Sequence, residues 1–399
     1  MESPFFQMET FLFLCMDIAL FDSPEIRTQL LPFTFTRPVA EIRVGILTLA
    51  DKWRMRGFTC SYSTLPYLGA KFAQASSAVQ VNGALCANKA LIEAISALQP
   101  GEELVANKQV LARNGEGGHP VEFEGEFTLI DRTWKIFAEN RNEIIADFEL
   151  LTSGRNSEPV TDPHTIVYNP QNLFIEKGAS IKAAIINAEN GPVYIGKNAQ
   201  VHEGAIISGA FALCEGSHVN MGAKIKGDST IGPYSKVGGE VSNSVIFGYS
   251  NKGHDGFLGN SVIGEWCNLG ADTNTSNLKN NYAKVRLWNY GSGRFDDTGL
   301  QFCGLMMADH AKCGINTMFN TGTVVGVGAN VFGAGFPKNF IPSFSWGGTG
   351  GLVTFRLNKF AEVAEAAMQR RGKTYDATEQ AIIAHVFEET APYRTWDKS

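Results

Sequence analysis

One histidine stands in a segment whose composition suits proton transfer. His254 lies between Lys252-Gly253 and Asp255-Gly256, in a polar, glycine-rich stretch. An imidazole has an unperturbed pKa of about 6.5, so it can accept a proton from an attacking amine near neutral pH. Taken alone, His254 is better explained as a turn residue with one satisfied hydrogen bond. No Ser-His-Asp or Cys-His pair is indicated by spacing, so no nucleophile for a covalent intermediate is predicted.

A second group of candidate residues lies near the N-terminus and consists of cations. They are Arg27, Arg37, Arg43 and Lys52, which stand beside prolines and threonines. A planar guanidinium can engage two phosphate oxygens, so the group predicts phosphate binding. A set of structural salt bridges explains the same residues equally well.

Composition narrows the class of protein. With 34 basic and 40 acidic side chains the net charge is −6, and no Lys/Arg run exceeds two residues, which disfavours a nucleic-acid partner. No apolar run approaches the ~20 residues of a membrane span. Phe11–Leu20 contains Asp17 and lacks a basic leader, so we expect a buried first strand. Seven cysteines without a C-x-x-C pair predict reduced thiols and a cytoplasmic location.

The element that must position His254 is a repeat of six residues. Starting at Ile195, eight consecutive steps of six fall on aliphatic residues, and the position four residues later is Ala or Ser in six of eight cases. A period of six fits neither a helix nor a simple strand, but it fits a triangular parallel β-coil with about 18 residues per turn. The eight residues are Ile195, Val201, Ile207, Leu213, Val219, Ile225, Ile231 and Val237.

The repeat is interrupted twice. After Val237 it slips by two residues, and a second run is expected through Phe257, Ile263 and Leu269. Residues 275–301 then hold a loop rich in Asn, Lys, Arg, Asp and Gly, and a third run follows from Met307. Loops ejected from a solenoid usually line its binding face, so we expect that role here, with a solvated insertion as the alternative.

The ends of the chain are built differently. Residues 1–160 are predicted to form an α/β domain, with strands at 11–21 and 77–81 and helices at 89–98 and 134–150. The β-coil is expected over 161–351. Helical patterns at 358–371 and 377–389 predict a tail over 352–399 that packs across the coil or a neighbouring subunit.

The hexad repeat resembles the left-handed β-helix of hexapeptide-repeat acyltransferases, whose subunits form trimers with active sites between adjacent coils. The stretch 252–271 is similar to the acetyltransferase signature of bifunctional GlmU enzymes, in which a G-H-x-x-Y-x-G-D element precedes N-x-G-A and C-N-Y. These enzymes acetylate glucosamine 1-phosphate and join the product to a uridyl group. The resemblance implies a homotrimer that uses acetyl-CoA.

Carried over residue by residue, the resemblance assigns roles in the coil. His254 falls on the catalytic base, Asn268 on a sugar contact and Ala271 on an acetyl-CoA contact. Phe257 stands where the family usually has a Tyr that touches the sugar phosphate. Asn277 matches the Asn that orients the acyl group.

Further assignments concern phosphate and acetyl-CoA. Lys284, in the ejected loop, lies near a phosphate-binding Lys, while Ile315 and Ala334 fall about where acetyl-CoA contacts recur. The Arg and Lys that clamp the sugar phosphate in the family have no clear match in 236–251, and Lys236 and Lys252 are the nearest candidates.

The opening of the chain resembles a divergent GlmU-like group with a shortened nucleotidyltransferase domain. The G-x-G-T-R loop is absent, and Arg37-Pro38 stands where larger enzymes carry Lys-Pro. Asn82-Gly83 falls where they place the Mg²⁺-binding Asp. Nucleotidyl transfer needs a carboxylate-held Mg²⁺, for which Asp22 and Asp131 are the substitutes.

The sequence thus predicts an acetyl-CoA-dependent N-acetyltransferase acting on an amino-sugar 1-phosphate, coupled to uridylyl transfer by the N-terminal domain. Two alternatives stay open: a nucleotidyltransferase whose coil only trimerises or regulates it, and a non-catalytic sugar-nucleotide-binding protein. A γ-type carbonic anhydrase is disfavoured because zinc needs at least three convergent ligands. The coil histidines, which show no close pair, are His202, His218, His254 and His310. No resident metal is predicted for the coil.

Overall fold

The N-terminal strands form one mixed sheet in the computed structural model, which describes residues 16–398. The strand order is β2-β1-β3-β5-β4-β6, with β1 parallel to β2 and β3, and with β5 antiparallel to β3 and β4. The strands are β1 (Met16–Phe21), β2 (Phe58–Ser63), β3 (Val79–Asn82), β4 (Glu102–Ala106), β5 (Gln109–Asn114) and β6 (His119–Glu122). The predicted strands at 11–21 and 77–81 are thereby confirmed for the described residues, since 11–15 lie outside them.

Five short helices flank this sheet. They are α1 (Pro24–Gln29), α2 (Leu49–Arg54), α3 (Lys89–Ala97), α4 (Lys135–Ala138) and α5 (Asn140–Thr152). The predicted helix at 89–98 is confirmed as α3, and Asn88 caps it by accepting a hydrogen bond from the Leu91 amide. The predicted helix at 134–150 forms as α4 and α5, which meet at Glu139. Single turns η1 (Phe33–Phe35) and η2 (Val39–Glu41) lie between α1 and α2.

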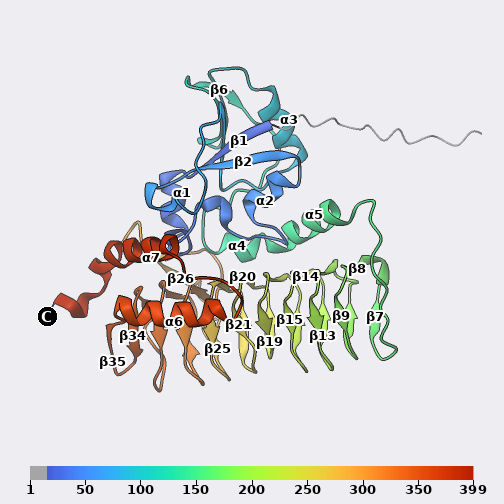
Figure 1. Cartoon of the computed structure of the whole chain (residues 1–399), viewed down its shortest axis with the longest axis vertical. Helices are drawn as coiled ribbons and strands as arrows, with labels where there is room; N and C mark the ends of the chain where they lie inside the picture. The colour runs from blue at the N-terminus through green and yellow to red at the C-terminus, as the bar shows by residue number, and fades with distance from the viewer. Residues whose placement is uncertain (1–15, 399) are drawn as a thin grey trace, which may run out of the picture.

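The rest of the chain winds into a three-sided parallel β-helix (Figure 1). The first side contains β7 (Ile166–Tyr168), β10 (Ile185–Asn187), β13 (Ile206–Ser208), β16 (Lys224–Lys226), β19 (Glu240–Ser242) and β22 (Phe257–Gly259). The second side contains β8 (Leu173–Ile175), β11 (Val193–Ile195), β14 (Phe211–Leu213), β17 (Ser229–Ile231), β20 (Val245–Gly248), β23 (Val262–Glu265), β28 (Leu305–Met307), β31 (Thr323–Val325) and β33 (Phe340–Ile341).

The third side carries the candidate site. It contains β9 (Ser180–Ile181), β12 (Gln200–Val201), β15 (His218–Val219), β18 (Lys236–Val237), β21 (Asn251–Lys252), β24 (Asn268–Leu269), β29 (Lys312–Cys313), β32 (Asn330–Val331), β34 (Ser345–Gly348) and β35 (Gly351–Thr354). A short parallel pair, β25 (Asn274–Thr275) with β30 (Met318–Phe319), stands apart from the three sides.

The predicted hexads form the core of the β-helix. All eight aliphatic residues from Ile195 to Val237 are at most 1% exposed. The second run is wrong at its first member, because Leu258 faces the core and pairs with Val241, whereas Phe257 is partly exposed. Lys252 occupies the interior rung between Val237 and Leu269, which an aliphatic residue would be expected to fill.

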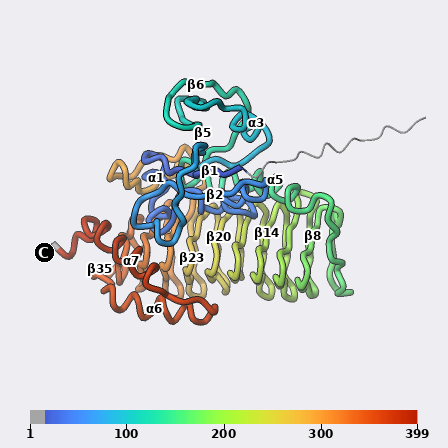
Figure 2. The backbone as a smooth tube through the Cα atoms, turned by 45° about the horizontal axis from the view of Figure 1, so that its top comes forward, coloured from blue at the N-terminus to red at the C-terminus, as the bar shows by residue number. Residues whose placement is uncertain are grey.

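The α/β domain packs onto the second side of the β-helix (Figures 1 and 2). Thr230 of β17 donates a hydrogen bond to the Gly45 carbonyl (2.9 Å), and Asn140 of α5 donates to the Asp228 carbonyl (2.9 Å). One apolar core joins Phe33 and Phe35 to Phe247 of β20 and to the C-terminal helices. The two parts therefore share buried contacts.

The C-terminal tail forms α6 (Leu357–Gln369) and α7 (Ala377–Glu389), which confirms both helical patterns. α6 runs along the third side of the β-helix (Figure 1). Within residues 16–398, no helix has the length and hydrophobicity needed to cross a membrane. The six cysteines that the structure describes are all free thiols.

Candidate active site

Four outward residues on successive strands of the third side stand in register. Lys236 lies opposite Asn251, Asn251 opposite Asn268, and Asn268 opposite Lys312. These rungs line a cavity of about 900 Å³ between the third side and α6. The wall on the helix side comes from Ala366, Ala367, Arg370 and Arg371. His254, Ala271 and Ile315, from turns that follow three of the strands, also line this cavity.

The turn that carries His254 is held by hydrogen bonds to its backbone carbonyls. The buried Lys252 ammonium donates to the carbonyls of His254 (2.6 Å) and Asp255 (3.2 Å), and burial lowers the pKa of this lysine to about 8. Asn220, two turns earlier in the coil, donates to the Gly253 carbonyl (2.7 Å). At Gly256, with φ +109°, a Cβ would stand 2.2 Å from the Thr273 carbonyl oxygen. Packing between neighbouring turns of the coil therefore fixes the backbone around the exposed imidazole.

An aromatic corner and the C-terminal helix close the other end of the cavity. The rings of Tyr249 and Trp266 stack at 4.4 Å and both line the cavity. Arg371, just after α6, donates to the Asn251 side-chain oxygen (3.0 Å). Burial and the neighbouring Arg370 lower the pKa of Arg371. The tail therefore contacts the site within the same chain.

Half of the residues that the sequence assigned to the coil site come together here. Those lining the cavity are Lys236, His254, Asn268, Ala271 and Ile315. Lys252 does not line it, because its side chain is 2% exposed and its ammonium is bound to two carbonyls. The assignment of Lys252 to the sugar phosphate is therefore replaced by a role in holding the His254 turn.

Four further predicted residues lie outside the cavity. Phe257 and Asn277 meet around Gly259, and Asn277 donates to the Asn260 side chain (2.7 Å). Lys284 is exposed in the ejected loop, and Ala334 is exposed after β32. None of these four lines the cavity within one chain.

The ejected loop does not line the cavity either, which corrects the expectation for it. Its hairpin, β26 (Arg286–Asn289) with β27 (Arg294–Asp297), turns toward the α/β domain. Asn289 donates to the Gln29 side chain (2.8 Å), and Tyr290 packs edge-on against Phe35. The loop thus joins the α/β domain to the β-helix.

Sequence reasoning missed Asn251, Lys312 and the placement of Arg370 and Arg371 at this site. The adjacent arginines at the end of a helical pattern were visible, but their packing on the third side depends on tertiary structure. Lys312 could have been found because it precedes Cys313 of the third run as Lys236 precedes Val237. Asn251 could not, because the turns of the coil on either side of it are shorter than three hexads.

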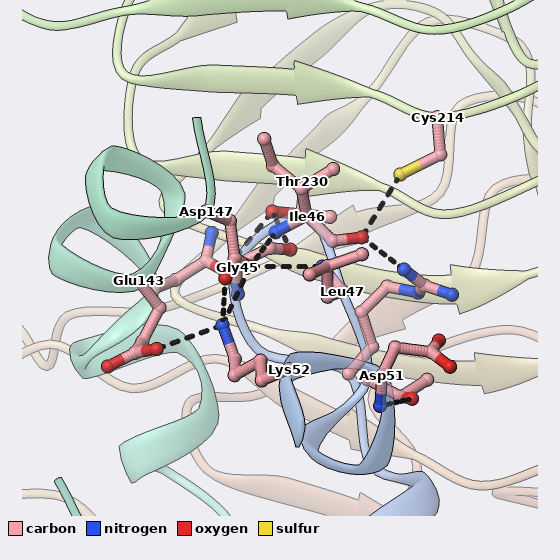
Figure 3. Close-up of polar contacts among 12 residues, drawn as sticks. Gly45, Ile46, Leu47, Asp51, Lys52, Glu143, Asp147, Cys214 and Thr230 are labelled. Atoms are coloured by element: carbon pink, nitrogen blue, oxygen red, sulfur yellow. Dashed lines mark hydrogen bonds and ion pairs between the residues drawn. The ribbon is translucent and has the colours of Figure 1, made fainter. Parts of the chain in front are cut away.

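In the α/β domain, Lys52 is an internal ion-pair partner (Figure 3). Its ammonium is 2.6 Å from the Asp147 carboxylate and 2.9 Å from Glu143, and the residue is 1% exposed. Burial opposes the charge, but the two carboxylates outweigh it and raise the pKa of Lys52. Asp147 also accepts from the amides of Ile46 (2.9 Å) and Leu47 (3.1 Å). Lys52 is therefore not available to bind phosphate.

The three arginines of the N-terminal group are also engaged. Arg37 is 5% exposed, binds the Asp309 carboxylate and lies 3.4 Å from Glu265, both in the β-helix. Arg27 donates to the Tyr67 hydroxyl (2.7 Å) and the Thr34 carbonyl. Arg43 donates to the carbonyl of Phe247 (3.1 Å). The expected phosphate cluster is thus a set of structural contacts, as the alternative interpretation stated.

The carboxyl ends of the parallel strands are where α/β folds usually bind ligands. Here η2 covers them: the Val39 amide donates to Asp22 (2.8 Å), and a Cβ on Gly83 would meet Ala40 at 3.3 Å. Asn82 is 1% exposed, its amide nitrogen donates to the Val110 carbonyl (3.1 Å), and its oxygen accepts from the Ala84 amide (3.1 Å). Both polar atoms of the residue that stands in the expected Mg²⁺ position are therefore used.

The remaining acids do not fit a Mg²⁺ site. Burial raises the pKa of Asp22, which disfavours the charged form that a metal needs, and Thr64 binds its second oxygen (2.5 Å). Asp131 is paired with Lys135 (2.9 Å). Across residues 16–398, no group of three or more His, Cys, Asp or Glu side chains is placed to hold a metal ion.

Comparison with known proteins finds matches to parts of this chain. Residues 18–156 match the family model for sugar nucleotidyl transferase. A bifunctional protein GlmU from Methanocaldococcus jannaschii is 36% identical over 87 residues, which cover 22% of this chain and 21% of that protein. A bifunctional sugar-1-phosphate nucleotidylyltransferase/acetyltransferase from Sulfurisphaera tokodaii is 26% identical over 214 residues, 53% of this chain and 46% of that one. The matches thus span less than half the length of either relative.

Two solved structures align with the chain at low similarity. An Arabidopsis UDP-N-acetylglucosamine acyltransferase is 17% identical, with a TM-score of 0.23, over 53% of this chain and 77% of that one. AntD, an N-acyltransferase from Bacillus cereus in complex with dTDP and coenzyme A, is 15% identical, with a TM-score of 0.23, over 52% and 91%. We draw no conclusion about function from structural alignments with these TM-scores.

A segment that matches the sugar nucleotidyl transferase family precedes a three-sided parallel β-helix, and helices follow at the end. Parts of the chain are thus similar to sugar nucleotidyl transferases and to bifunctional nucleotidylyltransferase/acetyltransferase proteins.

Proposed function

We propose that the β-helix transfers an acetyl group from acetyl-CoA to the amine of an amino-sugar 1-phosphate, with glucosamine 1-phosphate as the first candidate. The observation that supports this proposal is the cavity beside α6 that His254, Asn268 and Ala271 all line. These residues match the acetyltransferase signature of GlmU enzymes. Both curated relatives are named as bifunctional proteins, and one name includes acetyltransferase.

In the proposed reaction His254 acts as a general base. Its imidazole accepts a proton as the sugar nitrogen attacks the thioester carbonyl carbon. The C–N bond forms, the C–S bond breaks, and the leaving sulfur takes the proton back from the imidazolium. Lys252 holds the His254 backbone, so it serves as a positioning residue. Asn268 contributes an amide that can contact the sugar.

Thiol release from acetyl-CoA in the presence of glucosamine 1-phosphate tests this proposal. A general base usually contributes 10²–10⁴-fold, so His254→Ala should lower turnover at least a hundredfold. The matched control is His218→Ala, which lies two rungs earlier on the third side and does not line the cavity. Turnover that survives the His254 substitution would remove His254 from the mechanism.

The oligomer implied by the resemblance is a homotrimer. The first side presents Ile166, Ile185 and Ile206 in register, with exposed fractions of 50%, 37% and 48%. Such an apolar stripe suits a contact with a second copy. In a trimer Phe257 and Asn277, which lie outside the cavity of their own chain, would serve a neighbouring one. Light scattering should give three times the 43.4 kDa monomer mass.

The family match over 18–156 favours a second activity, nucleotidyl transfer to the sugar phosphate. The test is pyrophosphate release from UTP with N-acetylglucosamine 1-phosphate. Release supports the activity, whereas binding of a UDP-sugar without release supports the non-catalytic interpretation. Release that persists when His254→Ala abolishes acetyl transfer would assign the two reactions to separate sites.

A further inference from the structure

The His254 cavity has an unbalanced charge. Its lining includes four basic residues besides His254, and it includes no Asp or Glu. The chain as a whole carries more acidic than basic side chains, 40 against 34, so this enrichment runs against the composition. No ion pair within the described part of the chain involves any of the four. They are Lys236, Lys312, Arg370 and Arg371.

The two arginines lie next to each other at the edge of the cavity, so both of their positive charges act on it. Arg371 is fixed on the third side by its 3.0 Å hydrogen bond to Asn251, and Arg370 precedes it at the end of α6. Burial and the adjacent charge of Arg370 both lower the pKa of Arg371. The helix positions these like charges over Lys236 and Lys312, which stand on rungs at either end of the Asn251–Asn268 pair. An anion in the cavity would relieve the repulsion.

We propose that Arg370 and Arg371, with Lys236, bind a phosphoryl group of the substrate, so that the C-terminal helix supplies the phosphate clamp that the early coil lacks. This inference rests on the proposed function for the location of the substrate. A guanidinium binds two phosphate oxygens through parallel N–H donors, which a single lysine cannot do. Phosphoryl groups are present both on an amino-sugar 1-phosphate and on coenzyme A, and both present the same chemistry to these cations.

Calorimetric titration of the full chain tests the inference without turnover. The ligands are used in pairs: glucosamine 1-phosphate against glucosamine, and coenzyme A against pantetheine. Arg370→Gln and Arg371→Gln should each raise the Kd for the phosphorylated ligand of one pair at least tenfold. The Kd for the unphosphorylated ligand of that pair should not change. The pair that responds identifies which substrate the arginines hold.

Arg356→Gln is the matched control, because it removes the same charge from the exposed N-terminal end of α6, away from the cavity. Arg370 is exposed and unpaired within the described residues, so its substitution tests the clamp even if loss of the Arg371–Asn251 bond loosens the helix. The inference would be overturned if Arg370→Gln and Arg371→Gln bound both phosphorylated ligands with the wild-type Kd. It would also be overturned if the wild type bound neither ligand. If binding of a phosphorylated ligand depended on the arginines but no acetyl transfer occurred, the phosphate clamp would stand and the proposed function would be rejected.

Discussion

Two groups of cations in this molecule look alike in the sequence and differ in the structure. The N-terminal group, which includes Arg37 and Lys52, is paired with buried carboxylates or carbonyl oxygens. The group around His254, which includes Lys236 and Arg370, faces a cavity that no carboxylate lines. Arg37 and Lys52 are neutralised by carboxylates of the chain, whereas no carboxylate neutralises the cavity cations, which makes the cavity the better candidate for an anionic ligand.

The partners of the N-terminal cations also have a structural purpose. Arg37 joins the α/β domain to Asp309 of the β-helix, and Lys52 joins α2 to Asp147 of α5. Burial opposes the charge of Asp309, but Arg37 outweighs it and lowers the pKa of that carboxyl. The first pair therefore ties the domain to the β-helix, and the second ties two helices within the domain. Among the cavity cations, Arg371 binds the Asn251 side chain and Lys312 binds the His310 carbonyl, but none is paired with a carboxylate of the described chain.

The largest effect is expected at Lys52. Lys52→Met would leave Glu143 and Asp147 buried without their cation, and breaking a buried pair in this way costs about 3–5 kcal/mol. Denaturant unfolding measures the loss. The comparison would fail if the variant kept wild-type stability and lost affinity for UTP, since Lys52 would then be a ligand contact.

Lys252 is expected to show opposite effects on activity and on stability. Lys252→Met fills the interior rung with an apolar side chain but removes the two bonds that hold the His254 turn, so acetyl transfer should fall at least tenfold while the free energy of unfolding rises. Lys224→Met, on an exposed rung of the first side, is the control.

The pH dependence of the same variant is a separate test. Burial lowers the folded pKa of Lys252 to about 8, whereas the unfolded value is about 10.4. Between these values the unfolded chain binds more protons, so wild-type stability gains from rising pH, by about 3 kcal/mol at most. Lys252→Met should lack this gain. If the free energies of unfolding of wild type and variant changed in parallel with pH, the pKa shift would not belong to Lys252.

The smallest effect is expected at Asn82. Asn82→Asp restores the residue type that larger enzymes use for Mg²⁺, but it removes the donor to the Val110 carbonyl and buries a charge. We expect a loss of about 1–3 kcal/mol. Pyrophosphate release should show no new dependence on Mg²⁺, and a Mg²⁺-dependent gain would reopen the metal site.

The β-helix was predictable because its core obeys a local period, from Ile195 to Val237 without exception. The prediction failed where the period changed, so that Leu258 took the interior place expected of Phe257. Lys252 gave no hydrophobic signal although it occupies a core rung. Local spacing cannot reveal such a side chain.

The division between buried cations and cations that line the cavity was not predictable, because their partners are distant in the sequence. Lys52 meets Asp147, 95 residues away, and Arg37 meets Asp309, 272 residues away. Arg371 reaches Asn251 across 120 residues. The motif around His254 located the centre of the cavity, but only tertiary structure shows which cations complete it.

A crystal structure of the full chain with coenzyme A and glucosamine 1-phosphate would show which group of cations binds phosphate. We expect phosphoryl density between the third side and the end of α6, within hydrogen-bond distance of Arg370 or Arg371, and the sugar amine beside His254. We expect no phosphoryl density at Arg27, Arg37, Arg43 or Lys52. Density at the N-terminal cations, with the His254 cavity empty of both ligands, would contradict this expectation.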